Sequence, residues 1–365
     1  MKKTLIAMAA LAVSGASFAQ VTIFGAVDAS YNYASGNTAA AGSQSKSSLG
    51  NSQLGSSKLG FMGLEDLGGG LKGKFWLEGG LANDSGAGKG TNTNNQAGAT
   101  GTNGLTFQRR SYVGLVGGFG ELKLGREYVN TFLGVQAATD PFGTNGPADS
   151  TQMALALGAT KGVATITNAS NMITYVTPSM GGFSATIQGF MGENVSGAAT
   201  SDDGGGYSVT GSYAAGPLYV ALGGQETKYN KTAALGVYTQ QSLAASYNFG
   251  VAKVNYVYTK EGLAITAHDL KNESNAFGVV VPFGAFALKG AYIAATNNVA
   301  GKGDQKGEMF GLGVDYSLSK RTKVYGTYGN IKNSDGGALY GAGVIGALSA
   351  NGSTDNYAIG VFHAF

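Results

Sequence analysis

The sequence predicts an all-β chain, a 16-stranded antiparallel transmembrane β-barrel. Three observations support this prediction. Apolar and polar side chains alternate in segments such as 183–191, 253–259 and 309–316, and a period of two is strand geometry. Tight turns alternate with long polar connections along the chain. After the N-terminal leader, no apolar run approaches the roughly 18 residues of a spanning helix.

The composition fits a wall with water on one side and lipid on the other. The 365 residues include 62 Gly, 19 Tyr and 17 Phe but only 5 Pro. Charged residues make up 12% of the chain, against roughly 25% in a typical soluble domain. A soluble β-sandwich also alternates, but its strands are usually about five or six residues long. The longer alternating segments therefore favour a barrel, in which closure pairs every backbone amide without an edge facing lipid.

Residues 1–19 are predicted to be a cleaved signal peptide. The sequence MKK supplies a positive start, an apolar centre follows, and Ser17-Phe18-Ala19 has the pattern of a cleavage site. Residues 20–365 then form one barrel domain. Cleavage removes two lysines and no acid, which lowers the formal net charge from +3 to +1, so no nucleic-acid partner is expected. The chain has no Cys, and no cofactor or metal is expected.

Two classes of connection set the number of strands. The tight turns lie at 66–70, 117–120, 178–182, 214–216, 248–250, 282–284 and 318–321, and the long loops at 33–56, 80–105, 129–168, 193–204, 229–235, 262–272, 295–306 and 332–354. Short periplasmic turns and long outside loops are typical of outer-membrane barrels, and sixteen strands enclose an aqueous channel. The last strand should close the barrel against the first, with Phe365 at the periplasmic rim.

The longest connection, about 129–168, is predicted to fold into the barrel and narrow it. It lacks strand alternation over roughly forty residues, and such loops are usually functional or disordered. Its apolar stretch MALALGA would be poorly placed in solvent. A loop that caps a subunit contact is the alternative interpretation.

Blocks spread over the whole mature chain resemble the general porins of betaproteobacteria. They are QVTIFGAVDASYNY at 20–33, SSKLGFMGLEDLGGGLKGKFWLE at 56–78, FQRRSYVGLVGGFGELKLGREY at 107–128, DPFG at 140–143, ITYVTPSMGGFSATIQ at 173–188, VDYSLSKRTKVYGTYGN at 314–330 and the aromatic C-terminus. The resemblance implies a homotrimeric, water-filled pore in the cell outer membrane, surrounded by lipid and lipopolysaccharide. Ions and small hydrophilic solutes would cross it by passive diffusion, through a constriction made by the third loop.

Candidate pore-lining charges come from strand alternation and from the resemblance. Alternation places a set of charges on the lumen face, because neighbouring leucines and phenylalanines take the lipid face; they are Lys58, Lys72, Lys74, Glu78, Arg110 and Lys123. The resemblance adds Arg109 and Arg126. Both occupy positions of the same parity (odd or even number in the strand) as lipid-facing residues. Arg126 therefore reaches the pore only if Gly125 bends the strand.

The resemblance also implies acids on the third loop opposite the basic wall. Asp140 and Asp149 are the candidates, although Asp beside Pro or Gly also forms turns. Lys58 stands where the family carries an arginine, Met62 stands at a further basic position, and no basic residue lies near Asn168. We therefore expect a constriction that is less basic than is typical of the family.

An enzyme and a solute-specific channel are the rival functions. The two histidines, His268 and His363, have no recognisable Ser or Asp constellation, so catalysis is not expected. GAGVIG at 341–346 matches a dinucleotide pattern without its strand–helix context. A solute-specific channel remains the alternative to general diffusion. Trp76 and Phe362 have lumen parity, which is too little aromatic surface to predict a dedicated pocket.

Overall fold

The computed structural model describes residues 21–97, 104–229, 235–265, 269–299, 301–341 and 345–365. The predicted signal peptide lies outside the described residues. The wall consists of β1 (Thr22–Thr38), β2 (Gly42–Asn51), β3 (Lys58–Gly68), β4 (Leu71–Ala82), β6 (Arg110–Gly117), β7 (Gly120–Tyr128), β8 (Asn168–Val176), β9 (Phe183–Phe190), β10 (Gly206–Ala215), β11 (Leu218–Tyr229), β12 (Gly236–Asn248), β13 (Lys253–Ala264), β14 (Asp269–Phe283), β15 (Phe286–Val299), β16 (Gly303–Ser317), β17 (Thr322–Ser334) and β18 (Ser353–Ala364).

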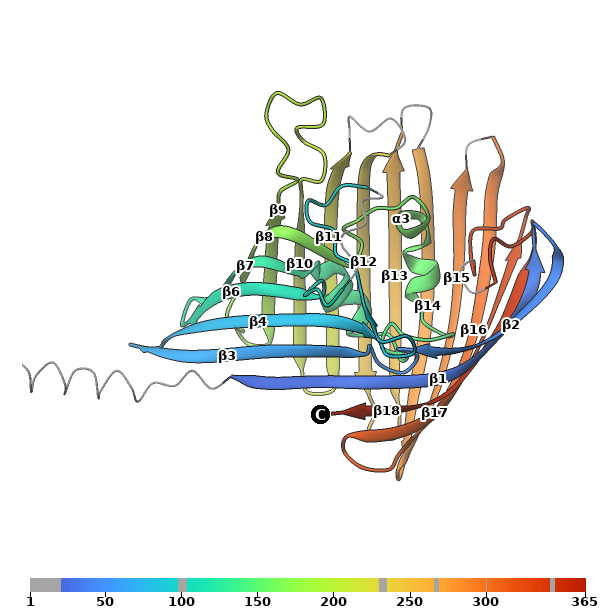
Figure 1. The fold of residues 1–365 in the computed structure, drawn as a ribbon, viewed down its shortest axis with the longest axis horizontal. Coiled ribbons are helices and arrows are strands. Elements are labelled where there is room, and N and C mark those ends of the chain that lie inside the picture. The colour runs from blue at the N-terminus through green and yellow to red at the C-terminus, as the bar shows by residue number, and fades with distance from the viewer. Residues whose placement is uncertain (1–20, 98–103, 230–234, 266–268, 300, 342–344) are drawn as a thin grey trace, which may run out of the picture.

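These strands form one closed antiparallel barrel (Figure 1). β2 and β3 pair with the two halves of β1 and so occupy one position in the wall. A two-residue strand, β5 (Ala87–Gly88), pairs with the end of β4 outside the main ladder. The wall therefore has sixteen strands, as predicted. β18 closes against β1, and the backbone N–H of Phe365 donates to the carbonyl of Gly25 at 3.0 Å.

The two faces of the wall have opposite character. In β13 the buried row is Asn255, Val257, Thr259 and Glu261. The opposite row of the strands carries large exposed apolar side chains, including Ile23, Val113, Ile173, Ile187, Val209, Leu222, Leu243, Phe277, Leu288, Phe310 and Ile359. Polar groups inward and apolar groups outward are the arrangement of a membrane barrel with an aqueous interior.

All seven tight turns lie where they were predicted, but several long loops are shorter than expected. β1 runs to Thr38 and β2 begins at Gly42, inside the predicted loop 33–56. β13 ends at Ala264, and β16 begins at Gly303, so the loops predicted at 262–272 and 295–306 are also shorter than expected. The extended strand ends carry polar residues on both faces. Alternation disappears there although the hydrogen-bonded ladder continues.

Between β2 and β3 the chain leaves the ladder at 52–57, and Asp28 of β1 holds this break together. The buried Asp28 carboxylate accepts hydrogen bonds from the backbone N–H groups of Leu54 (2.6 Å) and Gly55 (2.8 Å). The backbone N–H of Asp28 donates to Ser57 Oγ at 2.9 Å. The chain therefore re-enters the wall at Lys58, the first residue of β3.

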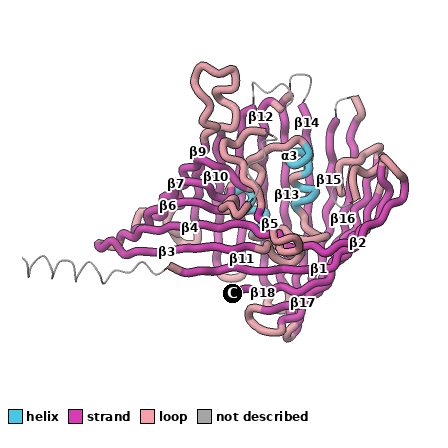
Figure 2. Tube along the Cα trace, viewed as in Figure 1, coloured by secondary structure: helices cyan, strands magenta, loops and turns pink. Residues whose placement is uncertain are grey.

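The connection between β7 and β8, the β7–β8 segment (129–167), lies against the buried face of the wall. It contains a π-helical turn η1 (Thr131–Ala137) and two short helices, α2 (Thr151–Ala154) and α3 (Ala156–Thr160). η1 contacts β10, β11 and β12, whereas α2 and α3 contact β13 and β14. Figure 2 shows these helices surrounded by strands. No helix of the described residues is long and apolar enough to cross a membrane.

Apolar packing and small wall residues accommodate this segment. Val135, Phe142 and Met153 pack in one cluster with wall residues that include Ala244 and Ile293. A side chain at Gly311 would collide with Ala148, and one at Gly329 would collide with the carbonyl of Pro147. These two glycines therefore let the segment approach the wall closely. The MALALGA stretch is accordingly sheltered from solvent, as the sequence suggested.

Candidate functional site

Oppositely charged side chains line the inner face where β3, β4, β6 and β7 lie side by side. Glu78 accepts a hydrogen bond from Arg109 Nε at 2.6 Å and lies 3.5 Å from Lys58 Nζ. The strand register places Glu78 opposite Arg110. Arg110 Nε in turn donates to Glu127 at 2.7 Å.

The same row of charges continues toward the periplasmic end. Lys123 Nζ lies 3.2 Å from Glu127 and 3.8 Å from Glu121, and Glu121 lies 2.7 Å from Lys74 Nζ. We call these residues the wall cluster; they are Lys58, Lys74, Glu78, Arg109, Arg110, Glu121, Lys123 and Glu127. Five cations and three carboxylates give the cluster a net charge of +2.

Aromatic side chains hold the cations of the wall cluster in place. The Arg110 guanidinium lies 4.9 Å from the ring centre of Trp76 and 5.1 Å from that of Tyr128. Lys123 Nζ lies 5.2 Å from the ring centre of Tyr112. Such cation–π contacts restrain a charged side chain without neutralising it. Tyr128 also stacks on Phe132 of η1, which connects the wall cluster to the β7–β8 segment.

Asp140 and Asp149, the predicted acids of the third loop, have different surroundings. The buried Asp140 carboxylate accepts hydrogen bonds from the backbone N–H groups of Phe142 (2.9 Å), Thr144 (3.2 Å) and Ser150 (3.2 Å), so it organises a turn. Asp149 lines a polar hollow of about 410 Å³ between the tip of the segment and β1, together with Asn32.

The two carboxyl groups are coupled to each other. Burial raises the pKa of Asp140 above its usual range. Burial, and then the charge of Asp140, raise the pKa of Asp149 well above its usual range. Both shifts favour the protonated form of these carboxyl groups relative to an exposed Asp.

Comparison with known proteins matches residues 4–336 to the Gram-negative porins. The chain belongs to this family. It is 38% identical to outer membrane porin protein 32 of Delftia acidovorans over 100% of both chains, and 30% identical to an outer membrane porin protein of Bordetella pertussis over 90% of this chain and 94% of that one. The structure matches an anion-selective porin from Comamonas acidovorans with a TM-score of 0.80 and 32% identity, covering 95% of this chain and 100% of the other.

Membership in this family confirms several predictions at once. The chain is an outer-membrane porin that forms a diffusion channel, and porins are channels, not enzymes. The predicted fold class and location are likewise confirmed.

Of the predicted site residues, Arg126 does not join the wall cluster. A bulge lies between Gly125 and Glu127, and Gly125 has a φ of +138°. The extra residue of this bulge lies on β8, so alternation continues along β7: Glu127 faces the cluster together with Lys123, and Arg126 stays in register with outward-facing Ser111. Arg126 instead donates to Ser170 Oγ at 2.7 Å and to the carbonyl of Asn92 at 3.0 Å. In this porin Arg126 therefore holds the loop that contains Asn92, and its place in the pore lining stays a prediction.

Arg109 reaches the wall cluster despite its lipid-facing parity. It precedes β6, and its backbone N–H donates to the carbonyl of Glu78 at 3.1 Å. Alternation does not constrain a residue beyond the end of a strand, so the side chain is free to turn inward. Lys72 lies on the lumen face of β4, nearer the periplasmic turn than the cluster, and is exposed. Glu121 and Glu127 were missed, although both alternate in step with Lys123 and so could have been predicted to face the lumen.

Sequence reasoning also missed the group that attaches the β7–β8 segment to the wall. Glu261 of β13 is fully buried, and its carboxylate accepts hydrogen bonds from the backbone N–H groups of Leu157 (3.0 Å) and Gly158 (2.9 Å) in α3. Tyr238 Oη (2.9 Å) and Asn272 Nδ2 (3.0 Å) donate to the same carboxylate from neighbouring strands. One wall side chain thus joins two strands and the segment.

Proposed function

We propose that this porin is a general diffusion channel with an anion preference, and that its narrowest part lies between the wall cluster and the β7–β8 segment. The observation that carries the proposal is the net charge of +2 on the wall cluster. Fixed charges on a pore wall of low dielectric constant concentrate ions of the opposite sign. On the segment, burial and then the charge of Asp140 raise the pKa of Asp149, which disfavours its ionised form.

Two further observations support a modest preference. Each arginine of the wall cluster has a carboxylate partner within 2.7 Å, so part of its field is compensated locally. The relative from Comamonas acidovorans is described as anion-selective, which agrees with the proposed sign. Expected permeants are small hydrophilic solutes and ions, with anions favoured.

Reconstitution in a planar bilayer under a tenfold KCl gradient tests this function. We expect the conductance to rise in steps. The reversal potential should lie on the side of the chloride equilibrium potential, well short of the roughly 59 mV that an ideally anion-selective channel would give. Absence of steps would contradict the channel itself. Conductance steps with a reversal potential on the side of the potassium equilibrium potential would contradict only the anion preference.

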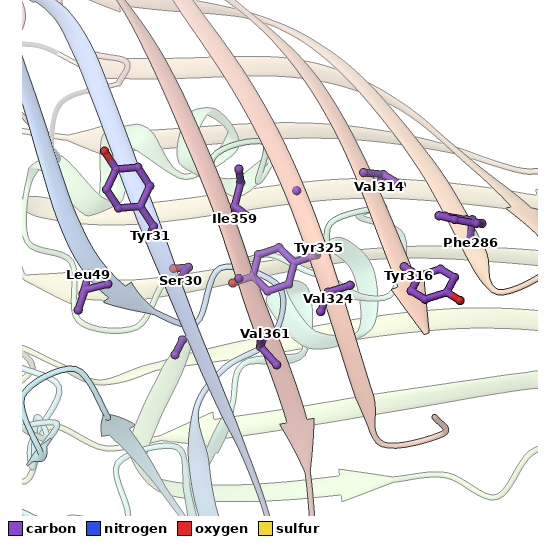
Figure 3. A pocket seen from close by; sticks show the side chains of 13 residues that line it. Ser30, Tyr31, Leu49, Phe286, Val314, Tyr316, Val324, Tyr325, Ile359 and Val361 are labelled. Atoms are coloured by element: carbon purple, nitrogen blue, oxygen red, sulfur yellow. The ribbon is translucent and has the colours of Figure 1, made fainter. Parts of the chain in front are cut away.

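We further propose that the porin is a homotrimer, embedded in outer-membrane lipid and lipopolysaccharide. Besides the family resemblance, the outer face of β1 and β16–β18 supports this assembly. It carries an apolar hollow of about 540 Å³ lined by residues that include Tyr31, Val314, Ile359 and Val361. Figure 3 shows these side chains projecting from neighbouring strands. A side chain of a second copy would fill such a hollow better than mobile acyl chains.

The oligomeric state is measurable in intact outer membranes. Brief treatment with an amine-reactive cross-linker should give dimer and trimer bands and no larger ladder. Replacing Ile359, which is 68% exposed, by Trp should reduce the trimer band if the hollow is an interface. Ile187, which is 50% exposed on β9, provides the matched control, because Ile187→Trp should leave the bands unchanged. A monomer band alone would contradict the trimer.

A further inference from the structure

The lumen wall carries an apolar hollow between the wall cluster and the periplasmic turn of β3 and β4. Its volume is about 450 Å³, and its floor is made by Met62, Leu64, Trp76 and Val116. The register places these residues on the same face as Lys74, with Met62 opposite Trp76 and Leu64 opposite Lys74. They therefore face the lumen and not the lipid.

Apolar side chains elsewhere on the inner face of this barrel are covered. Ile293 and Met309, for example, are buried in the cluster that includes Phe142 and Met153 of the β7–β8 segment. Leu64, by contrast, is 47% exposed on the lumen face. Apolar surface left open to water in a concave site is characteristic of ligand binding. The hollow is therefore a candidate subsite along the permeation path.

Two lysines define the charge of its occupant. Lys74 Nζ lies 5.9 Å from the ring centre of Trp76 and 2.7 Å from Glu121, and this carboxylate compensates most of its charge. Lys72 also lines the hollow, is exposed, and makes no ion pair with any of the described residues. A free ammonium group beside an apolar floor and an indole ring matches an anion with a flat apolar body.

We propose that this hollow is a weak subsite for aromatic monocarboxylates on their way through the channel. The ring would lie against Trp76 between Leu64 and Val116, and the carboxylate would face Lys72. The inference rests on the proposed anion-preferring channel and specifies one class of its solutes. Weak binding suits a channel, because an occupant that is held tightly would block the flux.

Trp76 provides a direct readout, because it is the only tryptophan of the chain. Titration of the folded porin in detergent with benzoate should change the Trp76 fluorescence along a saturable curve. Acetate, which lacks the ring, and benzylammonium, which carries the opposite charge, should leave it nearly unchanged at the same ionic strength. In planar bilayers benzoate should reduce the single-channel KCl current along the same concentration curve.

Two variants locate the subsite, and a third serves as the control. Lys72→Gln should weaken benzoate binding by roughly two- to fivefold, the range of an exposed ion pair. Leu64→Ser should weaken it by roughly tenfold through loss of apolar contact. Lys253→Gln, at the first residue of β13 and on the same periplasmic side of the opposite wall, should have no effect. Circular dichroism shows whether each variant retains its β-structure.

The outcomes separate the two proposals. If the porin gives conductance steps in KCl with an anion preference, but benzoate and acetate change the Trp76 fluorescence equally, only the subsite proposal is overturned. Unchanged benzoate curves in both Lys72→Gln and Leu64→Ser would also overturn it. If the porin binds benzoate in detergent but shows no KCl steps in the bilayer, the proposed channel function fails while the subsite survives.

Discussion

Replacing Glu261 by Gln should release the β7–β8 segment from the wall and make the channel current noisier. The Glu261 carboxylate accepts four hydrogen bonds, two from backbone N–H groups of α3 and two from Tyr238 and Asn272. A Gln side chain offers one acceptor oxygen, and its amide group would face donors. At least two buried donors would lose their partner, at a cost of about 1–3 kcal/mol each.

The barrel itself should survive this substitution. Its strands are joined by a continuous antiparallel ladder that does not involve the Glu261 side chain. The cost of Glu261→Gln therefore falls on the attachment of α3. A segment that moves within the channel should give open-state noise and partial closures at voltages that leave the wild-type current steady.

Trypsin provides an independent measurement of release. Lys161 is the only lysine or arginine in 129–167, and it follows α3 directly. Cleavage after Lys161 should be faster in Glu261→Gln than in the wild-type porin. Glu273→Gln is the matched control, because Glu273 lies on the adjacent strand with its carboxylate 2.6 Å from the exposed Lys260. Wild-type noise together with wild-type cleavage in Glu261→Gln would show that the carboxylate does not hold the segment.

The sequence alone predicts the wall of this porin well for a physical reason. Each strand separates lipid from water, so its side chains must alternate, and the parity of Lys58, Lys74 and Glu78 could be read from neighbouring apolar residues. The prediction failed where that constraint ends. Strand ends beyond the membrane are polar on both sides, and Arg109 lies outside its strand, free of the alternation.

The other misses depend on contacts between distant residues. Glu127 shares the lumen parity of Glu121 and Lys123, but its partner Arg110 lies 17 positions earlier in the chain, on β6. Glu261 has inward parity in the sequence, but its partners Leu157 and Gly158 are more than a hundred positions away. A periodic pattern shows which face a side chain takes, whereas its partners depend on how the β7–β8 segment folds across the barrel.

Changing single charges of the wall cluster should move ion preference in opposite directions. Lys58→Glu should shift the reversal potential toward the potassium equilibrium potential, and Glu127→Gln should shift it toward the chloride equilibrium potential. In Lys58→Glu the new carboxylate would lie near Glu78, which is 3.5 Å from Lys58 Nζ. Like charges at this distance favour a proton on one of them, so the shift should be smaller than two charges would produce. Glu127→Gln leaves Arg110 and Lys123 without their shared carboxylate, and both cations then act on the lumen.

The comparison requires a charge reversal outside the lumen. Lys320 lies in the periplasmic turn between β16 and β17, and Lys320→Glu changes the net charge as much as Lys58→Glu does. Its reversal potential under the tenfold KCl gradient should match that of the wild-type porin. If Lys320→Glu and Lys58→Glu shift the potential equally, the total charge of the protein sets the preference. If Lys58→Glu and Glu127→Gln both leave it unchanged, the wall cluster does not face the narrow part of the channel, and the constriction lies elsewhere along the β7–β8 segment.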